Sequence, residues 1–186
     1  LHEVAYPVAA KVRSRDILHK TEAGGVRLGL ASRTEFEAGV AAMLAAVGQA
    51  RPGAAIEGVL VQHMERGRME AIVGFRHDPL VGPVVMIGAG GTLAEIYQDF
   101  ALAVAPVDVD EARAMIARVK AFALIRGYRN QAPADVDALA RAVSDFSRLA
   151  LLPGQPVAEA EINPLIVKDD GVVAVDGLLV MRNTPE

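Results

Sequence analysis

Apolar residues along the chain follow two different periods, and this pattern predicts a mixed α+β fold. Residues 6–12 form a short β-prone run, and residues 26–30 alternate between apolar and polar positions as a second strand would. Ser32 and Glu35 then have the spacing of a helix capping box, and apolar residues repeat at helical intervals as far as Pro52-Gly53. The chain is therefore expected to begin with two strands and one helix.

Several strands are predicted next, without a helix between each pair. These strands cover residues 56–64, 69–75 and 83–87. The apolar residues of 93–104 fit either period, and we favour strands there because Pro106 follows. Sequential strands of this kind indicate antiparallel α+β layers rather than a Rossmann sheet.

The last part of the sequence predicts two helices and a closing β-hairpin. Asp108 and Glu111 mark the start of the first helix, and the second is expected to begin at about Pro133, a residue suited to a first helical turn. Two strands, residues 157–167 and 172–180, are separated by Asp170-Gly171, which is a strong hairpin signal.

Composition excludes several classes of protein. The net charge is −4 with scattered arginines, which argues against broad nucleic-acid binding. Cysteine is absent, so disulfide frameworks and thiolate metal sites are excluded. No apolar run approaches the roughly twenty residues of a membrane helix, and the opening residues do not resemble a signal peptide. We expect a cytoplasmic domain that binds neither nucleic acid nor membrane.

Two familiar nucleotide-binding motifs are not supported. The segment that starts at Gly88-Ala-Gly90 begins like a dinucleotide fingerprint, but Leu93 stands at the last glycine position. No P-loop sequence occurs anywhere in the chain. A phosphate site, if present, must therefore be built from residues that are far apart in the sequence.

Candidate phosphate chemistry lies near the start of the chain. Lys11, at the end of the first predicted strand, could place its charge on a phosphate oxygen. His19-Lys20 and Gly24-Gly25 put a nucleophilic imidazole, a cation and a flexible backbone hinge within seven residues. Taken singly, these residues have simpler explanations: Lys11 as an edge-strand lysine that discourages aggregation, and His19 as a solvated loop residue.

Candidate metal ligands lie in the closing hairpin. Glu161 and Asn163 are two residues apart, so they should share one face of their strand, and Asp176 could meet them from across the hairpin. Carboxylate and amide oxygens, completed by water and phosphate, are how proteins usually hold Mg²⁺. The alternative is the polar face of an exposed hairpin. Apolar flanking residues favour a buried hairpin, in which carboxylates would need a cation.

Together these motifs resemble one known family. Lys11, the His19-Lys20 and Gly24-Gly25 segment, and Glu161-Ile-Asn-Pro-Leu165 are similar to motifs in the ATP-grasp domain of NDP-forming (ADP-forming) acyl-CoA synthetases. These enzymes are relatives of the nucleotide-binding β-subunit of succinyl-CoA synthetase. Residues 7–20, 78–91 and 124–129 also match, so the resemblance covers essentially the whole chain.

The resemblance implies a fold and a set of residue roles. The fold would be ATP-grasp, with residues 1–64 and 65–186 as two α+β lobes that hold ATP between largely antiparallel sheets. The resemblance implies that Lys11 contacts phosphates beside Gly24 and Gly25, that the backbone of Gln62, His63 and Met64 reads adenine, and that Glu70 lies near the ribose.

It also implies a metal site and a phosphate relay. Asn163 and Asp176 would bind Mg²⁺ with support from Glu161, and His19, aided by Lys20, would relay phosphate.

The resemblance also implies a reaction and partners. Acyl-CoA, ADP and phosphate would be interconverted with acid, CoA and ATP through acyl-phosphate and phosphohistidine intermediates. CoA-binding domains or an α-subunit would complete the enzyme, and the family's domain normally begins some tens of residues earlier. We therefore expect an incomplete first lobe and no complete reaction from this chain alone. Self-association into a homo-oligomer is left open.

Two alternatives remain open at this stage. One is a regulatory module of a fused protein acyltransferase that binds nucleotide or acyl-CoA without turnover. The other is an ATP-grasp carboxylate–amine ligase, which the His19-Lys20 segment fits less well.

Overall fold

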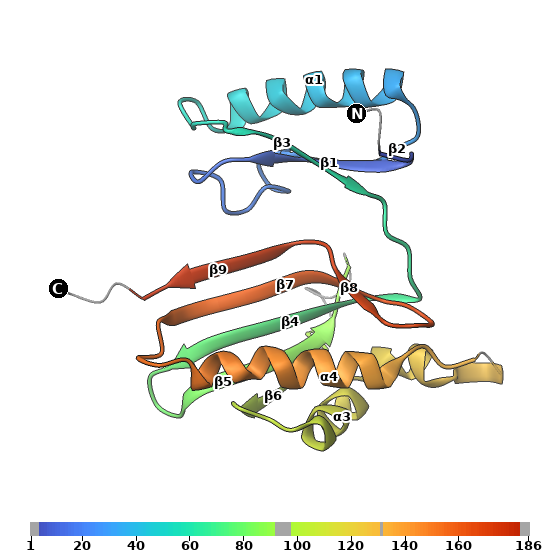
Figure 1. Ribbon diagram of the computed structural model, residues 1–186, viewed down its shortest axis with the longest axis vertical. Coiled ribbons are helices and arrows are strands. Elements are labelled where there is room, and N and C mark those ends of the chain that lie inside the picture. Colours follow the sequence, from blue (N-terminus) through green and yellow to red (C-terminus); the bar gives the residue numbers. More distant parts are fainter. Residues whose placement is uncertain (1–3, 92–97, 131, 183–186) are drawn as a thin grey trace. The chain divides into compact units, whose positions relative to one another are not determined.

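The computed structural model describes residues 4–91, 98–130 and 132–182. The chain divides into two compact units, Leu1–Met64 and Glu65–Glu186, which are described separately below (Figure 1). Within the described ranges, no helix has the length and apolar character needed to cross a membrane.

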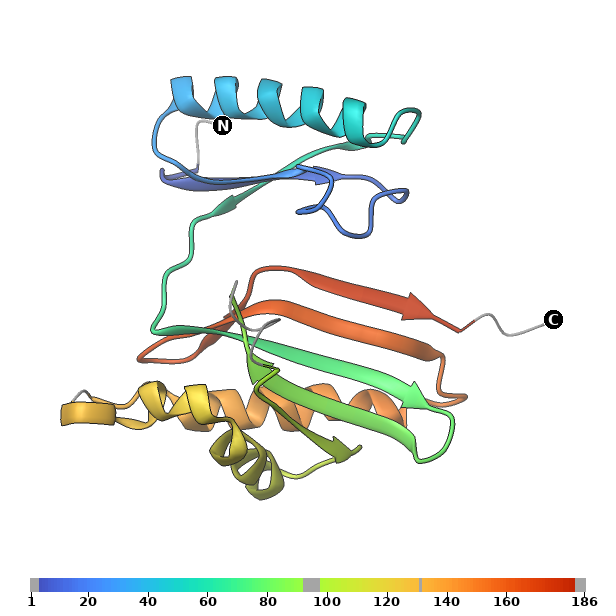
Figure 2. The same ribbon diagram turned by 180° about the vertical axis from the view of Figure 1, so that it is seen from behind.

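The first unit is a three-stranded antiparallel sheet with one helix on one face (Figures 1 and 2). Its elements are β1 Val8–Arg13, β2 Val26–Leu30, α1 Arg33–Ala50 and β3 Gly58–His63, and the strand order is β2-β1-β3. The predicted cap is confirmed, because Glu35 N–H donates to Ser32 Oγ at 3.2 Å. Ala31 N–H donates to the Glu35 carboxylate at 2.9 Å, so the start of α1 is fixed from both sides.

The central strand β1 places its residues alternately on the two faces of this sheet. Val8 and Ala10 pack with Phe36 and Met43 of α1, and Val12 packs with Val47 of the same helix. Because side chains alternate along a strand, Ala9 and Lys11 lie on the face that α1 does not cover.

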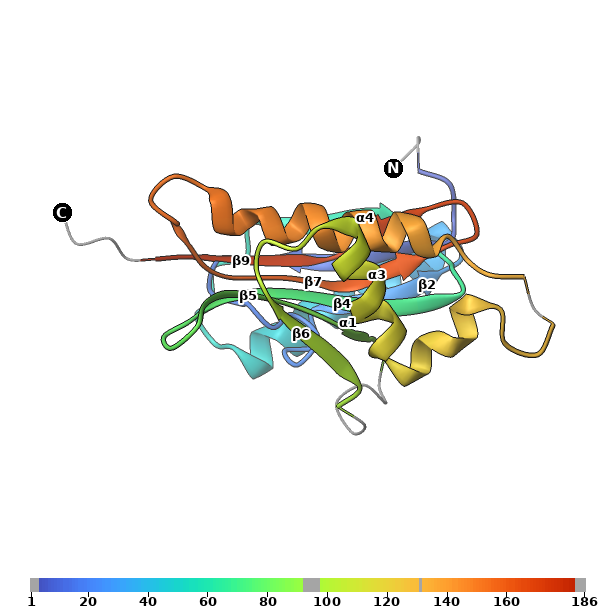
Figure 3. The ribbon, with the colours of Figure 1, turned by 90° about the horizontal axis from the view of Figure 1, so that it is seen from below.

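The second unit is a six-stranded antiparallel sheet with helices on one face (Figures 1 and 3). Its strands are β4 Met69–Asp78, β5 Gly82–Ala89, β6 Phe100–Val104, β7 Val157–Val167, β8 Val172–Ala174 and β9 Gly177–Met181. The order is β6-β5-β4-β7-β8, with β9 also paired to β7. The helices α3 Val109–Arg118 and α4 Val136–Ser147 cover one face. We call the other face the open face.

One apolar core lies between this sheet and its helices. Buried side chains of β4 and β5, including Val73 and Ile87, pack with Met115 of α3 and Leu139 of α4. Two-residue alternation therefore leaves the neighbouring residues of these strands on the open face.

Several boundaries differ from the sequence prediction. Helix α4 begins at Val136 rather than at Pro133, because Asp135 is the N-cap and accepts the Ala138 N–H at 2.8 Å. Of the ambiguous stretch 93–104, the strand β6 is confirmed and residues 92–97 lie outside the described chain. The predicted last strand is divided into β8 and β9. Three 3₁₀ segments were not predicted: η1 Lys120–Arg126, η2 Tyr128–Asn130 and η3 Arg148–Leu151.

Candidate functional site

Lys11 lies on the middle strand of the first unit, on the face opposite α1. Its Cα partners are Val26 on β2 and Leu60 on β3, so it is not on an edge strand. The residue is only 6% exposed. A cation buried this deeply requires an anionic or polar neighbour. A lysine that discourages aggregation lies exposed on an edge strand, so that role does not explain the burial of Lys11. The position is consistent with a phosphate contact.

Gln62 shares this sheet face with Lys11. It pairs with Ala9, while Lys11 pairs with Leu60, so the two polar side chains occupy neighbouring positions on the same side of the sheet. Gln62 Oε1 is buried and accepts no hydrogen bond from any described residue. A buried acceptor in this state is costly, and a ligand that supplies an N–H donor would satisfy it.

The two residues after Gln62 are the last two residues of the first unit. His63 is exposed, with Nδ1 3.4 Å from Ala5 O, and Met64 N–H donates to Pro7 O at 3.1 Å. The main chain of Met64 is therefore fixed to the segment that leads into β1. The connector, by which we mean Gln62, His63 and Met64, thus has a defined backbone conformation up to the last residue of the unit.

His19 lies on the loop between β1 and β2. It is exposed and Lys20 is partly buried, while Ile17 and Ala23 on either side are buried against Val12 and Val47. Both ends of the loop are therefore anchored in the core, and the imidazole is presented to solvent between them.

The two glycines of this loop serve close packing, which the sequence did not predict, and their role as a flexible hinge stays a prediction. Gly25 N–H donates to Lys20 O at 2.7 Å, and Val12 N–H donates to Gly25 O at 2.8 Å. A Cβ on Gly25 would lie 2.5 Å from Val12 Cγ1. Gly24 has a left-handed φ of 70°, which other residues rarely adopt. These contacts hold the His19 loop against β1.

Asn163 and Asp176 are brought together by the closing hairpin. Asn163 N–H donates to Asp176 O at 3.1 Å, across the point where β8 ends and β9 begins. The pairing of β4 with β7 also shifts register between Ala71 and Val73, opposite the Asn163-Pro164 dipeptide. Irregularities of this type turn side chains away from the regular ladder, and they are common beside functional sites.

These oxygen donors are less buried than the sequence analysis expected. Asn163 is exposed, and Glu161 and Asp176 are only partly buried, so the argument that buried carboxylates need a cation was wrong. Across the described residues there is no group of three or more His, Cys, Asp or Glu suited to a metal. A metal here would depend on the Asn163 amide together with carboxylates, a donor set that suits Mg²⁺ with its retained waters.

Glu70 packs against the glycine-rich turn at residues 88–91. Gly90 N–H donates to Glu70 O at 2.7 Å, and a Cβ on Gly90 would come within 3.0 Å of Glu70 atoms. A Cβ on Gly91 would lie 3.8 Å from Glu70 Oε2. The glycines thus allow the backbone of residues 90–91 to approach Glu70 closely. The partial resemblance of this segment to a dinucleotide fingerprint did not suggest that role.

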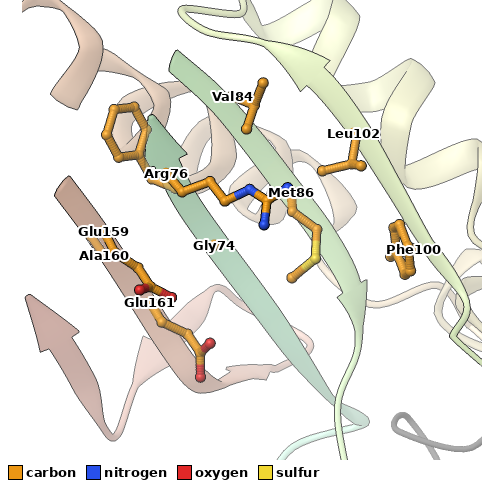
Figure 4. Close-up of a pocket in the computed structure, with 10 residues that line it drawn as sticks. Gly74, Arg76, Val84, Met86, Phe100, Leu102, Glu159, Ala160 and Glu161 are labelled. Carbon is orange, nitrogen blue, oxygen red and sulfur yellow. The ribbon is translucent and has the colours of Figure 1, made fainter. Parts of the chain in front are cut away.

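A pocket of about 260 Å³ lies on the open face of the second unit (Figure 4). Glu159 and Glu161 of β7 line one side of it, and an apolar wall lines the other. Arg76 of β4 extends between the two sides above Gly74, which has no side chain to fill the space. The apolar wall consists of Val84, Met86, Phe100 and Leu102.

Sequence reasoning found only Glu161 among the residues that line this pocket. Alternation could have indicated the rest, because Gly74 pairs with Glu161 and Arg76 pairs with Glu159. The β4–β5 turn below Arg76 is ordered by Asp78, whose carboxylate accepts the backbone N–H groups of Leu80 and Val81 at 2.9 and 3.2 Å. These hydrogen bonds lower the pKa of Asp78.

Comparison with known proteins identifies relatives over nearly the whole chain. A family described as an ATP-grasp domain matches residues 1–181. The ADP-forming acetate–CoA ligase I of Archaeoglobus fulgidus is 39% identical over 178 residues, which are 96% of this chain and 26% of the ligase. The β-subunit of ADP-forming acetate–CoA ligase I of Pyrococcus furiosus is 34% identical, over 96% of this chain and 77% of the subunit. The chain therefore spans about a quarter of the first relative and three quarters of the second.

Solved structures of a dinucleotide-forming acetyl-coenzyme A synthetase 1 from Ca. Korarchaeum cryptofilum have the same fold. A complex with coenzyme A and Ca-AMPCP superposes with a TM-score of 0.89 at 34% identity, over 97% of this chain and 79% of that chain. Another holds coenzyme A and Mg-AMPPCP with its phosphohistidine segment pointing towards the nucleotide binding site. Its TM-score is 0.79 at 30% identity, over 97% of this chain and 79% of that chain.

Proposed function

Because this chain belongs to the ATP-grasp family and is homologous to ADP-forming acyl-CoA synthetases, we propose that it binds Mg-ATP and exchanges a phosphoryl group with it. The observation that carries this proposal is the pair of buried polar groups on the sheet face of the first unit opposite α1. It combines the buried cation of Lys11 with the unsatisfied acceptor Gln62 Oε1. A nucleotide offers the complementary groups, namely phosphate oxygens and base N–H donors.

Each nucleotide contact is assigned to a residue by its chemistry. Lys11 neutralises phosphate charge, and the connector residues Gln62, His63 and Met64 receive the base. Glu70 accepts hydrogen bonds from the ribose hydroxyls, since its carboxylate is exposed beside a turn of glycines. Gly24 packs against Ala46 of α1 and Gly25 against Val12 of β1, so their contribution to phosphate binding would be to fix the loop that carries Lys20.

Asn163 and Asp176, with Glu161 in support, are the residues that would hold Mg²⁺. Their partial exposure fits a cation that dehydrates reluctantly and binds through few protein ligands. When bound, Mg²⁺ neutralises charge on the phosphates and helps to align them for transfer. The hairpin contributes by holding the two oxygen-bearing residues together through the Asn163–Asp176 backbone hydrogen bond.

His19 is proposed to carry the phosphoryl group in transit. A neutral imidazole nitrogen attacks the γ-phosphorus, the bond to the β-phosphate oxygen breaks, and ADP leaves while the imidazole proton passes to solvent. Lys20 steadies the charged group. The exposure of His19 on an anchored loop supports this role, since the ring is accessible to a donor and to a later acceptor.

The pocket beside Glu161 is proposed to admit the acceptor segment of a partner domain. Its carboxylates can accept a hydrogen bond from an imidazole N–H, and its apolar wall can pack against the surrounding segment. The partner would be the CoA-binding part of the same synthetase, fused or as an α-subunit, in the cytoplasm. The named relatives are acid–CoA ligases or synthetases, and none is an acyltransferase, so they do not favour the regulatory alternative.

Magnesium-dependent nucleotide binding tests this proposal. The affinity of the purified chain for ATP would be measured by calorimetry with and without Mg²⁺, for the wild type, Asp176→Asn and Asp170→Asn. Asp170 is a matched control because it is an exposed carboxylate in the turn of the same hairpin. We expect Mg²⁺ to tighten binding in the wild type and in Asp170→Asn only. Equal Mg²⁺ dependence in all three proteins would refute the metal assignment, and no ATP binding in any would refute the function.

A further inference from the structure

The segment that forms η1 and η2, residues 120–130, is the most basic stretch of the second unit and contains none of the residues proposed for the nucleotide site. We call it the basic projection. It contains Lys120, Arg126 and Arg129, and no acidic residue occurs between Val119 and Ala134, although the whole chain carries a net charge of −4. Within the described chain these three cations form no ion pair. No carboxylate of the described residues therefore neutralises their charge.

One side of the projection is fixed to the protein. Phe122 and Ile125 are 0% and 1% exposed and belong to the core of the second unit. Residues three apart in a 3₁₀ helix lie above one another, so these two side chains define its buried side. The Asp99 carboxylate accepts the N–H groups of Lys120 and Ala121 at 3.0 and 2.7 Å, which fixes the start of η1.

The other side presents an apolar and cationic surface. Leu124 and Tyr128 are 55% and 48% exposed, and the Arg129 guanidinium carbon is 5.2 Å from the centroid of the Tyr128 ring. Gly127 and Arg129 both have left-handed φ angles, 96° and 52°. For Arg129 this conformation is uncommon, so the backbone is held in a costly shape that stacks the cation on the ring. Figure 3 shows this yellow segment extending beyond α3 and the sheet.

We propose that the basic projection is a docking surface for the rest of the synthetase, and that it enters an apolar recess rimmed by carboxylates. Tyrosine, arginine and an exposed leucine on a rigid support form the type of surface that anchors protein interfaces. The three cations require an acidic rim, because like charges across an interface would repel. The partner follows from the proposed function, and the first relative extends far beyond the aligned 26% of its length.

Site-specific photocrosslinking in the full-length synthetase tests this surface. A photoreactive phenylalanine derivative would replace Tyr128, and in a separate protein Leu151, which is 59% exposed on η3 of the same unit and serves as the control. We expect the probe at position 128 to crosslink to a peptide outside this chain that is flanked by Asp or Glu. Equal yields at the two positions would overturn the proposal, as would crosslinks only to a second copy of residues 1–186.

A charge-reversal variant separates this proposal from the nucleotide site. In the crosslinking protein, Arg126→Glu with Arg129→Glu should lower the yield at position 128 about tenfold, because two favourable pairs become repulsive. The same pair of substitutions in the isolated chain should leave its affinity for Mg-ATP unchanged. An unchanged crosslink yield would refute the acidic rim, whatever the outcome of nucleotide binding. Loss of nucleotide binding by the variant would refute a pure docking role.

Discussion

Replacing Lys11 with methionine separates a phosphate-binding role from a structural one. The residue is 6% exposed and lies between Val26 and Leu60 on the middle strand of its sheet. Methionine is an unbranched side chain one atom shorter, and it removes the charge together with the three N–H donors. A charge-assisted contact contributes about 1.5–3 kcal/mol, so Lys11→Met should weaken ATP binding by roughly 10- to 150-fold. Stability without nucleotide is measured as well, because removing one partner of a buried ionic contact costs about 3–5 kcal/mol where that contact supports the fold.

Two measurements on the purified chain distinguish a phosphate-binding role of Lys11 from a structural one. Calorimetric titration with Mg-ATP gives the affinity, and denaturant unfolding without nucleotide gives the stability. Arg13→Met is the matched control, since Arg13 is on the same strand two residues further on, with a side chain that is 71% exposed. The control should bind ATP as the wild type does. If Lys11→Met instead loses stability and keeps its affinity for ATP, Lys11 is a structural residue and the reasoning from burial fails.

Two further predictions concern the β4–β7 ladder and the His19 loop. In a denaturant titration, Gly67→Ala should lower the free energy of unfolding by about 1–3 kcal/mol, because the new Cβ would clash with Val167 O. Gly177→Ala is the control, since its Cβ would have its nearest contact at 3.4 Å, and it should have a much smaller effect. Equal losses for the two variants would contradict the packing argument. In the full-length synthetase, His19→Ala should still form acyl-phosphate from acyl-CoA and phosphate but make no ATP from ADP. ATP formation at the wild-type rate would make His19 an ordinary loop residue.

The fold was predictable wherever local signals decide the structure. Capping at Ser32 and Asp108, a strand at residues 26–30 and the Asp170-Gly171 turn each depend on neighbouring residues, and the structure confirms all of them. Burial does not alternate along that strand, however, because Leu28 is 60% exposed. Helix α4 shows where such signals conflict, since Pro133 and Asp135 both suit a helix start and only the hydrogen bond to Asp135 decides between them. The 3₁₀ segments depend on tertiary contacts such as those of Asp99, which is 21 residues from Lys120.

The candidate site was predictable as a set of residues but not as an arrangement. Strand alternation alone put Glu161 and Asn163 on one face, and it could not reveal the irregular pairing near Pro164 or the exposure of Asn163. The role of Gly25 was also hidden, because its close contact is with Val12, which is distant in sequence. Arg76 gave no local signal, since its significance arises only from strands that pair across the sheet.

The pairing of β7 has a consequence for how the second unit opens. This strand is hydrogen-bonded to β4, β8 and β9 along its length, and it also carries Glu161 and Asn163. A strand held on both sides cannot fray by itself, so its amide protons should exchange with solvent only when most of the unit unfolds. The tip of the His19 loop differs, because its hydrogen bonds from Ala23 N–H to His19 O and from Gly24 N–H to Thr21 O close local turns among mostly exposed residues, and such turns can open without unfolding a sheet. Slow amide exchange is therefore expected for Glu161 on β7 and fast exchange for the His19 loop, so the loop could rearrange while the strand that carries the proposed metal ligands stays folded.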